Sequence, residues 1–439
     1  MKRRSTLYSG LLALAVYLTA WCVCPIPAYG QGYLTPTDVV MPPEKASQES
    51  VDQSAAKASL RFLGLDVFPH AAVTAMYDDN LFISHTRPVS DLEWMLTPGL
   101  TLIKGDVSTY LPGSVTLVQL RDLLDYSLVD DSARPQRFIG IDYTPSVNVF
   151  TEHGENNNVD QFAGLSAGYA FSRLAVGLDQ DYSHVDEKNN EAGTRLTRDL
   201  YETRLRNRYE LTDRTSLEVN GKYSLLDYPD PRYQGFQEVR NENWFNRQVG
   251  AKVNAGFGLA FGFVFPQVQS DQTYEQAAVR GVYRLSGKMD LRLTAGAEYR
   301  QYGSERSDTV SPVFSLAAIY QLSEKTIFTL DGHRMDYPSP FGDYNYQTLG
   351  VYGGVRQELV GGWSVSLSGG YDSIEYVYLL SGPNIGRSDG YFSLRASVDY
   401  EMHRRMKASI FYIRRQDDST MNQYSYVDNM TGIQIGWRY

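Results

Sequence analysis

The chain has 439 residues, a formal net charge of -10 and 33 tyrosines against only 2 cysteines. Its acidic balance, without a basic stripe, argues against a nucleic-acid binder, because phosphate binding needs basic side chains. No apolar run after residue 30 is long enough to cross a membrane as a helix, so the sequence excludes a helical membrane protein.

Residues 1–30 are typical of a signal peptide. Residues 2–4 are basic, residues 7–20 are apolar, and residues 28–30 form a small-x-small cleavage site. Both cysteines, Cys22 and Cys24, lie in this segment, so the mature chain is expected to have no thiol. An uncleaved anchor is the alternative, but the apolar segment is too short to favour it.

Residues 31–61 form the next expected unit, a flexible periplasmic leader rich in Pro, Ser, Gln and Ala. Such a composition buries too little apolar surface to fold alone. A short partner-binding helix over residues 53–60 is the alternative. Over residues 62–439 the pattern changes to alternation of apolar and polar residues, and we expect one transmembrane β-barrel there.

The alternation is clearest in the segment LRLTAGAEYR. Leu291, Leu293 and Tyr299 share one face of this segment, and Arg292 and Arg300 lie on the other. The segments are longer than the five or six residues usual in soluble sheets, and about 9–11 tilted residues cross a bilayer. The expected strands cover residues 65–77, 91–104, 137–150, 160–171, 174–185, 199–211, 215–227, 243–256, 258–269, 272–285, 289–301, 309–322, 326–335, 344–358, 363–376, 388–402, 406–417 and 430–439.

The connections alternate between short and long. Expected short turns lie at residues 172–173, 212–214, 257–258, 286–288, 323–325, 360–362 and 403–405, and expected long polar loops at 186–198, 229–242, 338–345 and 417–428. Short periplasmic turns opposite long outer loops are typical of outer-membrane barrels, which have an even number of strands. The sequence therefore predicts an all-β fold, a transmembrane antiparallel barrel of about 18 strands, with 16 and 20 left open.

Residues 106–136 do not fit the alternation. Their parity places them on the periplasmic side, where Leu117, Leu120 and Leu124 have helical spacing. We expect a periplasmic or plug-like insert. An extra hairpin, which would give 20 strands, is the alternative.

The C-terminus is the most specific local signal. Ile433, Ile435, Trp437 and Tyr439 alternate up to the last residue, which resembles the terminal signal read by the outer-membrane assembly machinery. An ordinary edge strand is the alternative. Aromatic residues near strand ends are expected to form two interfacial girdles, where an amphipathic ring keeps one edge wet: Trp94, Tyr169, Tyr223, Phe265, Tyr283, Trp363, Tyr376 and Trp437.

Several motifs resemble the β-barrel porin 2 family of Gram-negative outer-membrane proteins. They are Pro69 in the first strand, Tyr-Asp-Asp-Asn at 77–80, Ser-Asp at 90–91 and Pro-Gly-Leu at 98–100. Residues 160–182 are similar in style. Since some members of that family are associated with exopolysaccharide gene clusters, the resemblance implies a polysaccharide-linked role in the outer membrane. The insert at 106–136 departs from the short turn usual there.

An 18-stranded barrel is wide enough for an aqueous lumen unless a loop or insert closes it. The charged residues expected to face that lumen are rich in arginine, whose fork of donors binds carboxylates and sugar hydroxyls. The alternative is that these charges pair with one another and are structural. The candidates are Lys222, Arg280, Arg284, Arg292, Glu298, Arg300, Arg356, Glu358, Arg395, Asp399 and Lys407, together with Glu218 and Lys252.

Catalysis has little support in the sequence, and no catalytic residue, cofactor or metal is expected. The G-x-S-x-G pattern at 164–168 lies within an expected strand, whereas a nucleophile needs a strand–turn–helix. A hydrolase with rim histidines near Asp181, Asp186 and Asp336 is the third functional alternative; the histidines are His85, His153, His184 and His333. Asp78 and Asp79 offer a weak calcium motif, for which a solvated loop is the alternative.

Two functional classes lead. The first is an outer-membrane channel that serves as a conduit for extracellular polysaccharide export or a related polar solute, with an arginine and aromatic track gated by the insert. The second is a general diffusion porin or structural barrel; a porin would show a loop folded inside the lumen and opposed charges. The expected partners are outer-membrane lipid, the assembly machinery, and polysaccharide with periplasmic export components, but no nucleic acid.

Overall fold

The computed structural model describes residues 60–105, 137–286, 288–303, 307–341, 344–378, 386–403 and 405–438. The expected signal peptide, nearly all of the leader, the insert at 106–136 and Tyr439 lie outside these ranges. Within the described ranges, no helix has the length and apolar character needed to cross a membrane.

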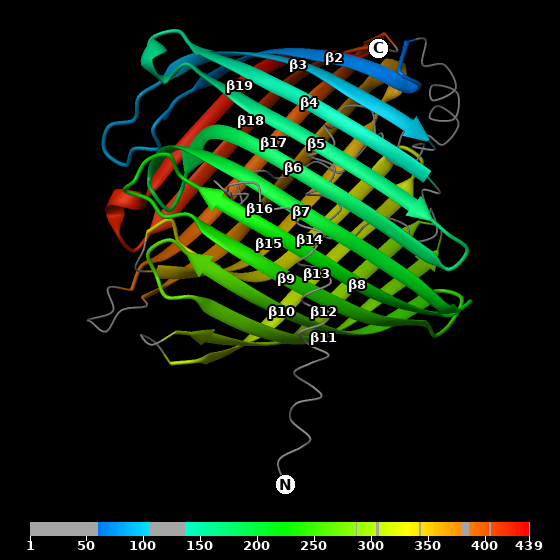
Figure 1. Ribbon diagram of the computed structural model, residues 1–439. Coiled ribbons are helices and arrows are strands. Elements are labelled where there is room, and N and C mark those ends of the chain that lie inside the picture. The colour runs from blue at the N-terminus through cyan, green and yellow to red at the C-terminus, as the bar shows by residue number, and fades with distance from the viewer. Residues whose placement is uncertain are drawn as a thin grey trace.

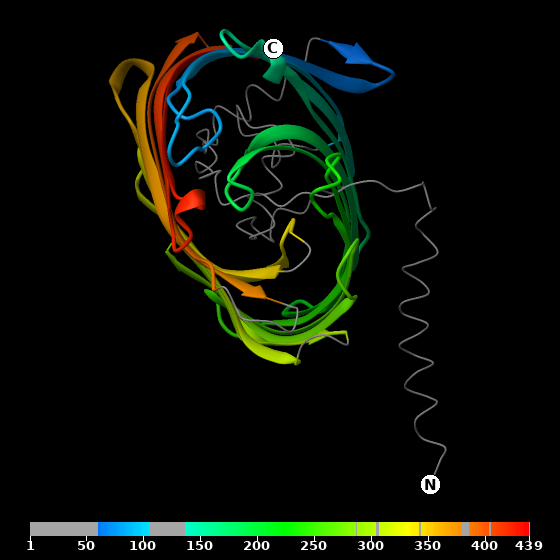
Figure 2. The same ribbon diagram turned by 90° about the vertical axis from the view of Figure 1, so that its left-hand side faces the viewer.

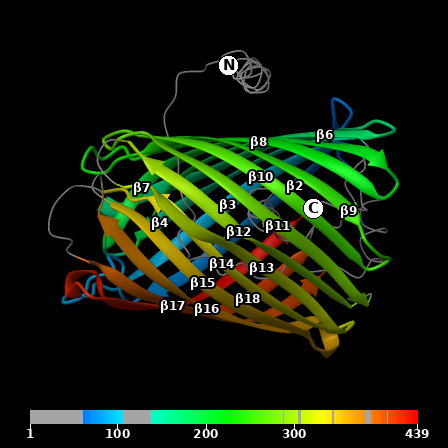
Figure 3. The same ribbon diagram turned by 90° about the horizontal axis from the view of Figure 1, so that it is seen from below.

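Eighteen long antiparallel strands, β2 to β19, form one closed ring. Each strand pairs with its neighbours in sequence, and β19 pairs with β2 from Met430 opposite Asp78 to Arg438 opposite His70. Figures 1 and 3 show the strands tilted in the same sense around the wall, as closure of a barrel requires. The prediction of about 18 strands is confirmed.

The strands have the following bounds: β2 Leu65–Asp78, β3 Asp91–Gly105, β4 Arg137–Phe150, β5 Asn158–Ala170, β6 Leu174–Asn189, β7 Thr194–Thr212, β8 Thr215–Asp227, β9 Phe236–Gln248, β10 Val253–Pro266, β11 Gln272–Ser286, β12 Met289–Tyr302, β13 Thr309–Ser323, β14 Thr326–Pro338, β15 Tyr344–Glu358, β16 Trp363–Tyr378, β17 Ser388–His403, β18 Met406–Ser419 and β19 Tyr426–Arg438. A two-residue strand, β1 (Arg61–Phe62), pairs with the start of β2. The short 3-10 turns are η1 (Gly154–Asn156), η2 (Val360–Gly362) and η3 (Asn422–Tyr424).

The two faces of the wall differ in chemistry, as β4 illustrates. Ile139, Ile141 and Tyr143 are exposed on the outer face, whereas Asp142 and Thr144 on the inner face are buried. The Thr101 hydroxyl donates a hydrogen bond of 2.6 Å to Asp142. An apolar outside and a polar inside are the reverse of a soluble protein and suit a barrel surrounded by lipid.

The two ends of the barrel also differ. Figure 1 shows the longer loops and the η3 turn at the left-hand end and tight turns at the right-hand end. At the tight-turn end, β15 and β16 are joined through Gly361 and Gly362, whose φ angles of 75° and 82° favour glycine. Strand β3 pairs directly with β4, so the ring has no place for additional strands between them and the 20-stranded alternative is wrong.

The expected turn at 257–258 is wrong. Phe257 lies within β10, paired with Phe245 of β9 and Val279 of β11, and the turn is at residues 249–252. Gly258, which suggested the turn, makes room for a side chain of a neighbouring strand instead, as does Gly262 in the same strand. A Cβ on Gly258 would lie 2.5 Å from the Trp244 ring, and one on Gly262 would lie 2.0 Å from Tyr274.

The shift of this turn also moves Lys252. The residue was expected on the lumen wall, but it ends the 249–252 turn, where it is exposed. The strands expected at 243–256 and 258–269 correspond to β9 and β10, which the structure places earlier in the chain, at Phe236–Gln248 and Val253–Pro266.

Candidate functional site

The eleven lumen candidates from Lys222 to Lys407 all lie on the inner, polar face of the wall by strand register. Most lie beside an opposite charge on their own strand or on another strand of the wall: Lys222 lies 3.1 Å from Glu202, Arg280 2.6 Å from Glu218, Arg300 2.7 Å from Glu298, Arg356 3.5 Å from Asp399, Lys407 3.5 Å from Asp399 and Arg284 3.8 Å from Asp290. The Arg395 guanidinium lies 5.5 Å from the Phe411 ring centre. Arg292 and Glu358 share the same face, beside Val282 and Ser364. Pairing of this kind gives the lumen a wet, charged wall without a single dominant site.

The hairpin that joins β6 and β7 leaves the wall. Strand β5 pairs with β6 only up to His184, and β8 pairs with β7 only from Asp199. Beyond these rows β6 and β7 pair only with each other, from Val185 opposite Arg198 to Asn189 opposite Thr194. Figure 2 shows this green hairpin arching inside the outline of the barrel. We call residues 185–198 the first hairpin.

The expected long loop at 186–198 is therefore wrong in form: most of it is strand. The turn itself is only residues 190–193, closed by a hydrogen bond of 2.9 Å from the Gly193 amide to the Asn189 carbonyl. Gly193 has a φ of 64°, which glycine adopts without strain. A short glycine turn therefore joins the two strands at the tip of the hairpin.

Lys188 fixes one face of the first hairpin to the closing seam of the barrel. Its ammonium lies 2.6 Å from Asp78 on β2 and 2.7 Å from Asp428 on β19, and all three side chains are buried. Asp78, Asp79 and Asp428 also form a group with the geometry of metal ligands. Because the Lys188 ammonium already bonds two of these carboxylates, it supplies the positive charge there.

The tip of the first hairpin binds three other segments. Arg387 donates to the backbone oxygens of Glu191 at 2.8 Å and Asn190 at 3.1 Å. The Tyr426 hydroxyl donates to the Asn190 side chain, and the Ser339 hydroxyl donates to Glu191 Oε2 at 3.0 Å. Burial raises the pKa of Glu191 to about 8, although Ser339 and Arg387 oppose the rise. The tip is thus held by polar contacts from β19 and from the loops after β14 and β16.

A second hairpin, residues 334–347, separates from the wall on one side only, because its β15 strand stays paired with β16 from Tyr344 opposite Tyr378 onward. Strand β13 pairs with β14 only from Ser323 to Phe314, and the remainder of β14 pairs only with β15. The freed end of β13 carries Pro312, which has no amide to donate, and its carbonyl accepts a hydrogen bond of 2.8 Å from Arg334. A proline at this position suits a strand end that has lost its partner.

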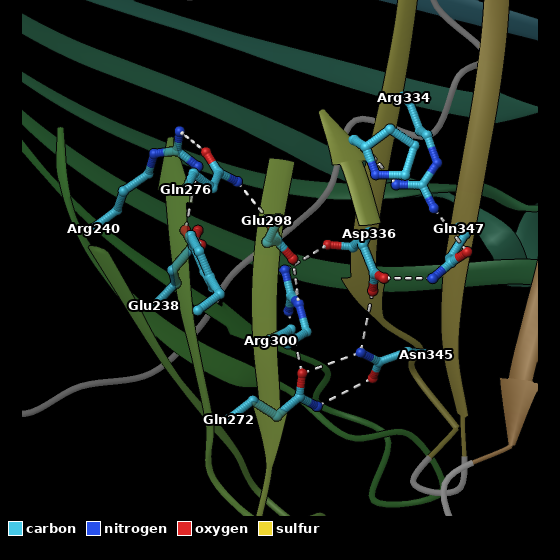
Figure 4. A network of polar contacts seen from close by, with 12 residues as sticks. Glu238, Arg240, Gln272, Gln276, Glu298, Arg300, Arg334, Asp336, Asn345 and Gln347 are labelled. Carbon is cyan, nitrogen blue, oxygen red and sulfur yellow. Dashed lines mark hydrogen bonds and ion pairs between the residues drawn. The ribbon is translucent and has the colours of Figure 1, made fainter. Parts of the chain in front are cut away.

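A buried polar network seats the second hairpin on β11 and β12 (Figure 4). The amides of Gln272 and Asn345 exchange two hydrogen bonds of 3.1 Å. Asp336 accepts from Asn345 at 3.3 Å and from Gln347 at 2.7 Å. Arg300 donates to Gln272 at 3.2 Å, which ties this network to the charges of the inner wall.

The two hairpins meet inside the lumen. Besides the contact between Ser339 and Glu191, Gln234 from the β8–β9 loop donates its backbone amide to the Pro340 carbonyl at 2.8 Å. The rings of Tyr233 and Phe341 lie 5.6 Å apart beside this junction. The hairpins start from nearly opposite parts of the ring, so their junction lies across the outer mouth (Figure 2).

Two apolar clusters pack around the junction. The first contains Ile83, Tyr346, Ile374, Tyr376, Tyr391 and Tyr426, and the second contains Leu196, Leu226, Tyr228, Phe236, Val264 and Tyr274. The expectation that Tyr376 belongs to an interfacial girdle is wrong, because its ring is buried in the first cluster, 4.2 Å from the Arg387 guanidinium. Trp94, Tyr169, Phe265, Tyr283, Trp363 and Trp437 are exposed on the outer face as expected.

The rim histidines are separated from one another. His153 lies 2.9 Å from Asp91, His184 2.9 Å from Asp199 and His333 3.1 Å from Asp331, rather than beside the acids expected. His85 contacts the Ser425 carbonyl at 3.0 Å. The G-x-S-x-G pattern lies within β5, where Ser166 bonds Asp179 on β6. These contacts support the walls of the barrel and do not converge on one reacting atom.

The residues that form the junction were missed by sequence reasoning. Lys188, Glu191 and Ser339 fell in segments expected to be long polar loops, and Arg387 fell between the strands expected at 363–376 and 388–402. A signal was present for the first hairpin: alternation already begins at Thr194, and residues 186–198 hold charged and amide side chains instead of the prolines of a solvated loop.

A family model described as TonB dependent receptor-like, β-barrel, matches residues 137–418. A search of curated proteins finds no match. Among solved structures, the chain is similar to OpdK of Pseudomonas aeruginosa, with 11% identity, a TM-score of 0.42, and coverage of 85% of this chain and 98% of the other. OccAB4 of Acinetobacter baumannii has 9% identity, a TM-score of 0.42, and coverage of 85% and 98%. The siderophore receptor PirA of P. aeruginosa has 8% identity, a TM-score of 0.38, and coverage of 85% and 80%.

Proposed function

Since the chain belongs to the TonB-dependent receptor-like β-barrel family, we propose that it is a gated outer-membrane channel for small polar solutes. The observation that carries this proposal is the junction of the two hairpins inside the lumen, made by Glu191 and Ser339. Both hairpins continue strands of the wall: the first has no wall partner beyond its last row with β5 and β8, and the second is free of β13 but stays paired with β16. The closed ring is the pore, and the hairpins are its gate.

The chemistry of the inner wall supports a polar solute. The wall presents paired charges such as Arg280 with Glu218, whereas large apolar side chains lie on the lipid-facing side. Opposed charges lining a water-filled lumen favour hydrated solutes and tune their selection.

A conduit for polysaccharide export is the more specific alternative. The inward-folded hairpins favour a diffusion porin over such a conduit. An inward-folded segment with opposed charges is the feature expected of a porin, whereas the insert that would gate a conduit lies outside the described residues. We also propose that the chain is related to the β-barrel porin 2 family and that its signal peptide is removed on export. The C-terminal residues are proposed to serve as the signal for the assembly machinery. Lipid and the assembly machinery are the partners that this role requires.

The test is single-channel conductance of the refolded chain in planar bilayers. Replacing residues 185–198 by Asn-Gly joins the paired residues His184 and Asp199 with a two-residue turn and keeps every row of the ring. We expect brief, rare openings of the unaltered chain and a steady, larger conductance of the shortened one. Heat-modifiable gel mobility of both proteins is the folding control.

Two outcomes would contradict the proposal. Equal conductance of both proteins would show that the first hairpin is not a gate, and absence of conductance from both would show that the barrel is not a channel. Acidic and neutral polysaccharides added to one side test the alternative, because block by a polymer requires that the polymer enters the open lumen.

A further inference from the structure

Asp417 on β18 is a buried carboxylate with no hydrogen-bond partner. Its exposed fraction is 0%, and neither of its oxygens has a hydrogen-bond partner. A buried carboxyl group without a hydrogen-bond partner is costly whether it is ionised or protonated, so its presence requires an explanation. The residue lies on the inner face of the wall, on β18.

Two tyrosines flank Asp417 on the same face. In the register of the sheet, Asp417 lies opposite Tyr391 of β17 and opposite Tyr426 of β19, so the three side chains form one row across three strands. Both tyrosines belong to the first apolar cluster, where Ile83 of the β2–β3 loop packs against them. A carboxylate between aromatic rings attracts a positive charge from both sides of the row.

The charged groups around this row are already engaged. Arg387 donates to Asp389 at 3.1 and 2.5 Å and to two backbone oxygens of the first hairpin. Arg415 pairs in register with Asp428, which bonds Lys188. Asp418, the next residue, is exposed and accepts from Gln416. Arg387 also lies 3.6 Å from the Tyr424 ring, so this region already binds one cation by a carboxylate together with aromatic rings.

The geometry favours an organic cation over a metal ion. Calcium requires six to eight oxygen ligands, supplied by several carboxylates and carbonyls. In the described part of the chain, the one group of acids with the spacing of metal ligands is Asp78, Asp79 and Asp428, which does not include Asp417. One carboxylate and two aromatic rings suit a compact ammonium group.

We infer that Asp417, Tyr391 and Tyr426 form a binding subsite for the ammonium group of a small organic amine. The inference rests on the proposed channel function, because the solute reaches this row when the hairpins leave the lumen. It deepens that function by naming the class of solute: small amines that pass the mouth by way of Asp417.

The experiment measures binding of methylammonium chloride to the full folded chain by isothermal titration calorimetry, with sodium chloride at matched ionic strength as the blank. The protein with residues 185–198 replaced by Asn-Gly is measured in parallel, so that access is not limiting. We expect binding that is at least tenfold weaker in Asp417→Asn and weaker in Tyr391→Leu. The matched control is Asp418→Asn, which changes the exposed neighbour and leaves binding unchanged.

Three outcomes would overturn the inference. They are equal binding by Asp417→Asn, no binding of methylammonium by either parent protein, and binding of calcium chloride at this row in place of methylammonium. Because calorimetry does not require conduction, binding without conductance would reject the channel and leave the subsite. Conductance without binding of methylammonium would reject the subsite and leave the channel.

Discussion

Lys188 is the residue on which the closed mouth depends most. Its ammonium is shared by two buried carboxylates, Asp78 and Asp428, that belong to the two strands closing the ring. Removing one partner of a buried ion pair costs about 3–5 kcal/mol, because it leaves uncompensated charge in a dry site. A single side chain therefore couples the position of the first hairpin to the seam of the barrel.

We predict that Lys188→Met increases the open probability in planar bilayers. The methionine fills a similar volume but leaves Asp78 and Asp428 repelling each other, so the first hairpin is released. Combining Lys188→Met with Asp78→Asn and Asp428→Asn removes that repulsion and should restore long closures. Lys222→Met is the matched control, because its partner Glu202 keeps Arg204 at 2.5 Å. Equal effects of both lysine substitutions would contradict this role.

We predict that the gate opens as the pH rises. The pKa of Glu191 is raised from its ordinary value of 4.5 to about 8, so its contribution to the closed state is complete below 4.5 and is lost as the pH rises through 8. The ionisable groups that interact with it include Arg387, Asp389 and three tyrosines, Tyr228, Tyr346 and Tyr376. Conductance recorded between about pH 5 and pH 9 should rise with pH in the unaltered chain, as expected for a carboxyl buried in its protonated form.

Glu191→Gln isolates that effect, because glutamine keeps the hydrogen bond with Ser339 and carries no proton to lose. We expect this variant to stay closed over the same pH range. A pH dependence that survives the substitution would assign the titration to another group.

At the scale of elements, each hairpin is a piece of the wall bent inward. The rows that remain in the ring end at His184 and Asp199 for the first hairpin. For the second they end at Phe314 and Arg334 between β13 and β14, whereas β15 stays paired with β16. Beyond these rows, side chains whose parity belongs to the outer face contact the inner wall, as Asn345 contacts Gln272. Because the hairpin ends are polar, they can lie either against the inner wall or in water outside the lumen.

We predict that Gln272→Leu loosens the second hairpin. The substitution removes the partner of the buried Asn345 side-chain oxygen and one acceptor of Arg300, at a cost of about 1–3 kcal/mol, while Asn345 keeps its hydrogen bond to Asp336. Hydrogen exchange at the amides of residues 344–347 should become faster while exchange in β18 stays unchanged. Gln301→Leu, at the exposed residue that faces away from the lumen on β12, should have no effect on either.

The alternation of apolar and polar side chains made most of the strands predictable. In glycine-rich sequence the predicted strand bounds were wrong. Strand β4 was placed at its observed bounds because apolar and polar residues alternate throughout it. Strand β10 was displaced because Gly258 was interpreted as part of a turn, whereas it makes room for the Trp244 ring. The sequence alone does not show which side chain of a neighbouring strand will pack over a glycine.

For the candidate site, the sequence predicted only which residues lie on the inner face of the wall. Parity placed Arg300 and Arg356 on the inner wall, since parity is a local property of each strand. The junction of Glu191 with Ser339 joins residues 148 positions apart, and it depends on where two strands lose their partners. Nothing in the local pattern of either segment encodes that meeting.

At the scale of the whole molecule, stability depends on the contrast between the two faces of the wall. Ile433 on β19 is exposed toward lipid, and its neighbour Gln434 faces inward, where it donates to Thr74 at 3.0 Å. The closing pair of strands, β19 and β2, therefore contributes both an apolar outer surface and a polar inner one.

We predict that Ile433→Arg destabilises the barrel by about 2–4 kcal/mol near the bilayer midplane, whereas Gln434→Arg is tolerated, because only the first puts a charge into lipid. Urea unfolding of the refolded proteins in vesicles, followed by tryptophan fluorescence, measures the difference. A larger loss for Gln434→Arg would reverse the assignment of the two faces.

The bent hairpins also make the state of each molecule visible from outside the cell. When the first hairpin is folded in, residues such as Asn190 are covered by Tyr426 and Arg387. When it straightens, the same residues stand at the rim as a surface epitope. An antibody raised against this tip would label open barrels on living cells and pass over closed ones, so occupancy of the open state can be counted without recording a current.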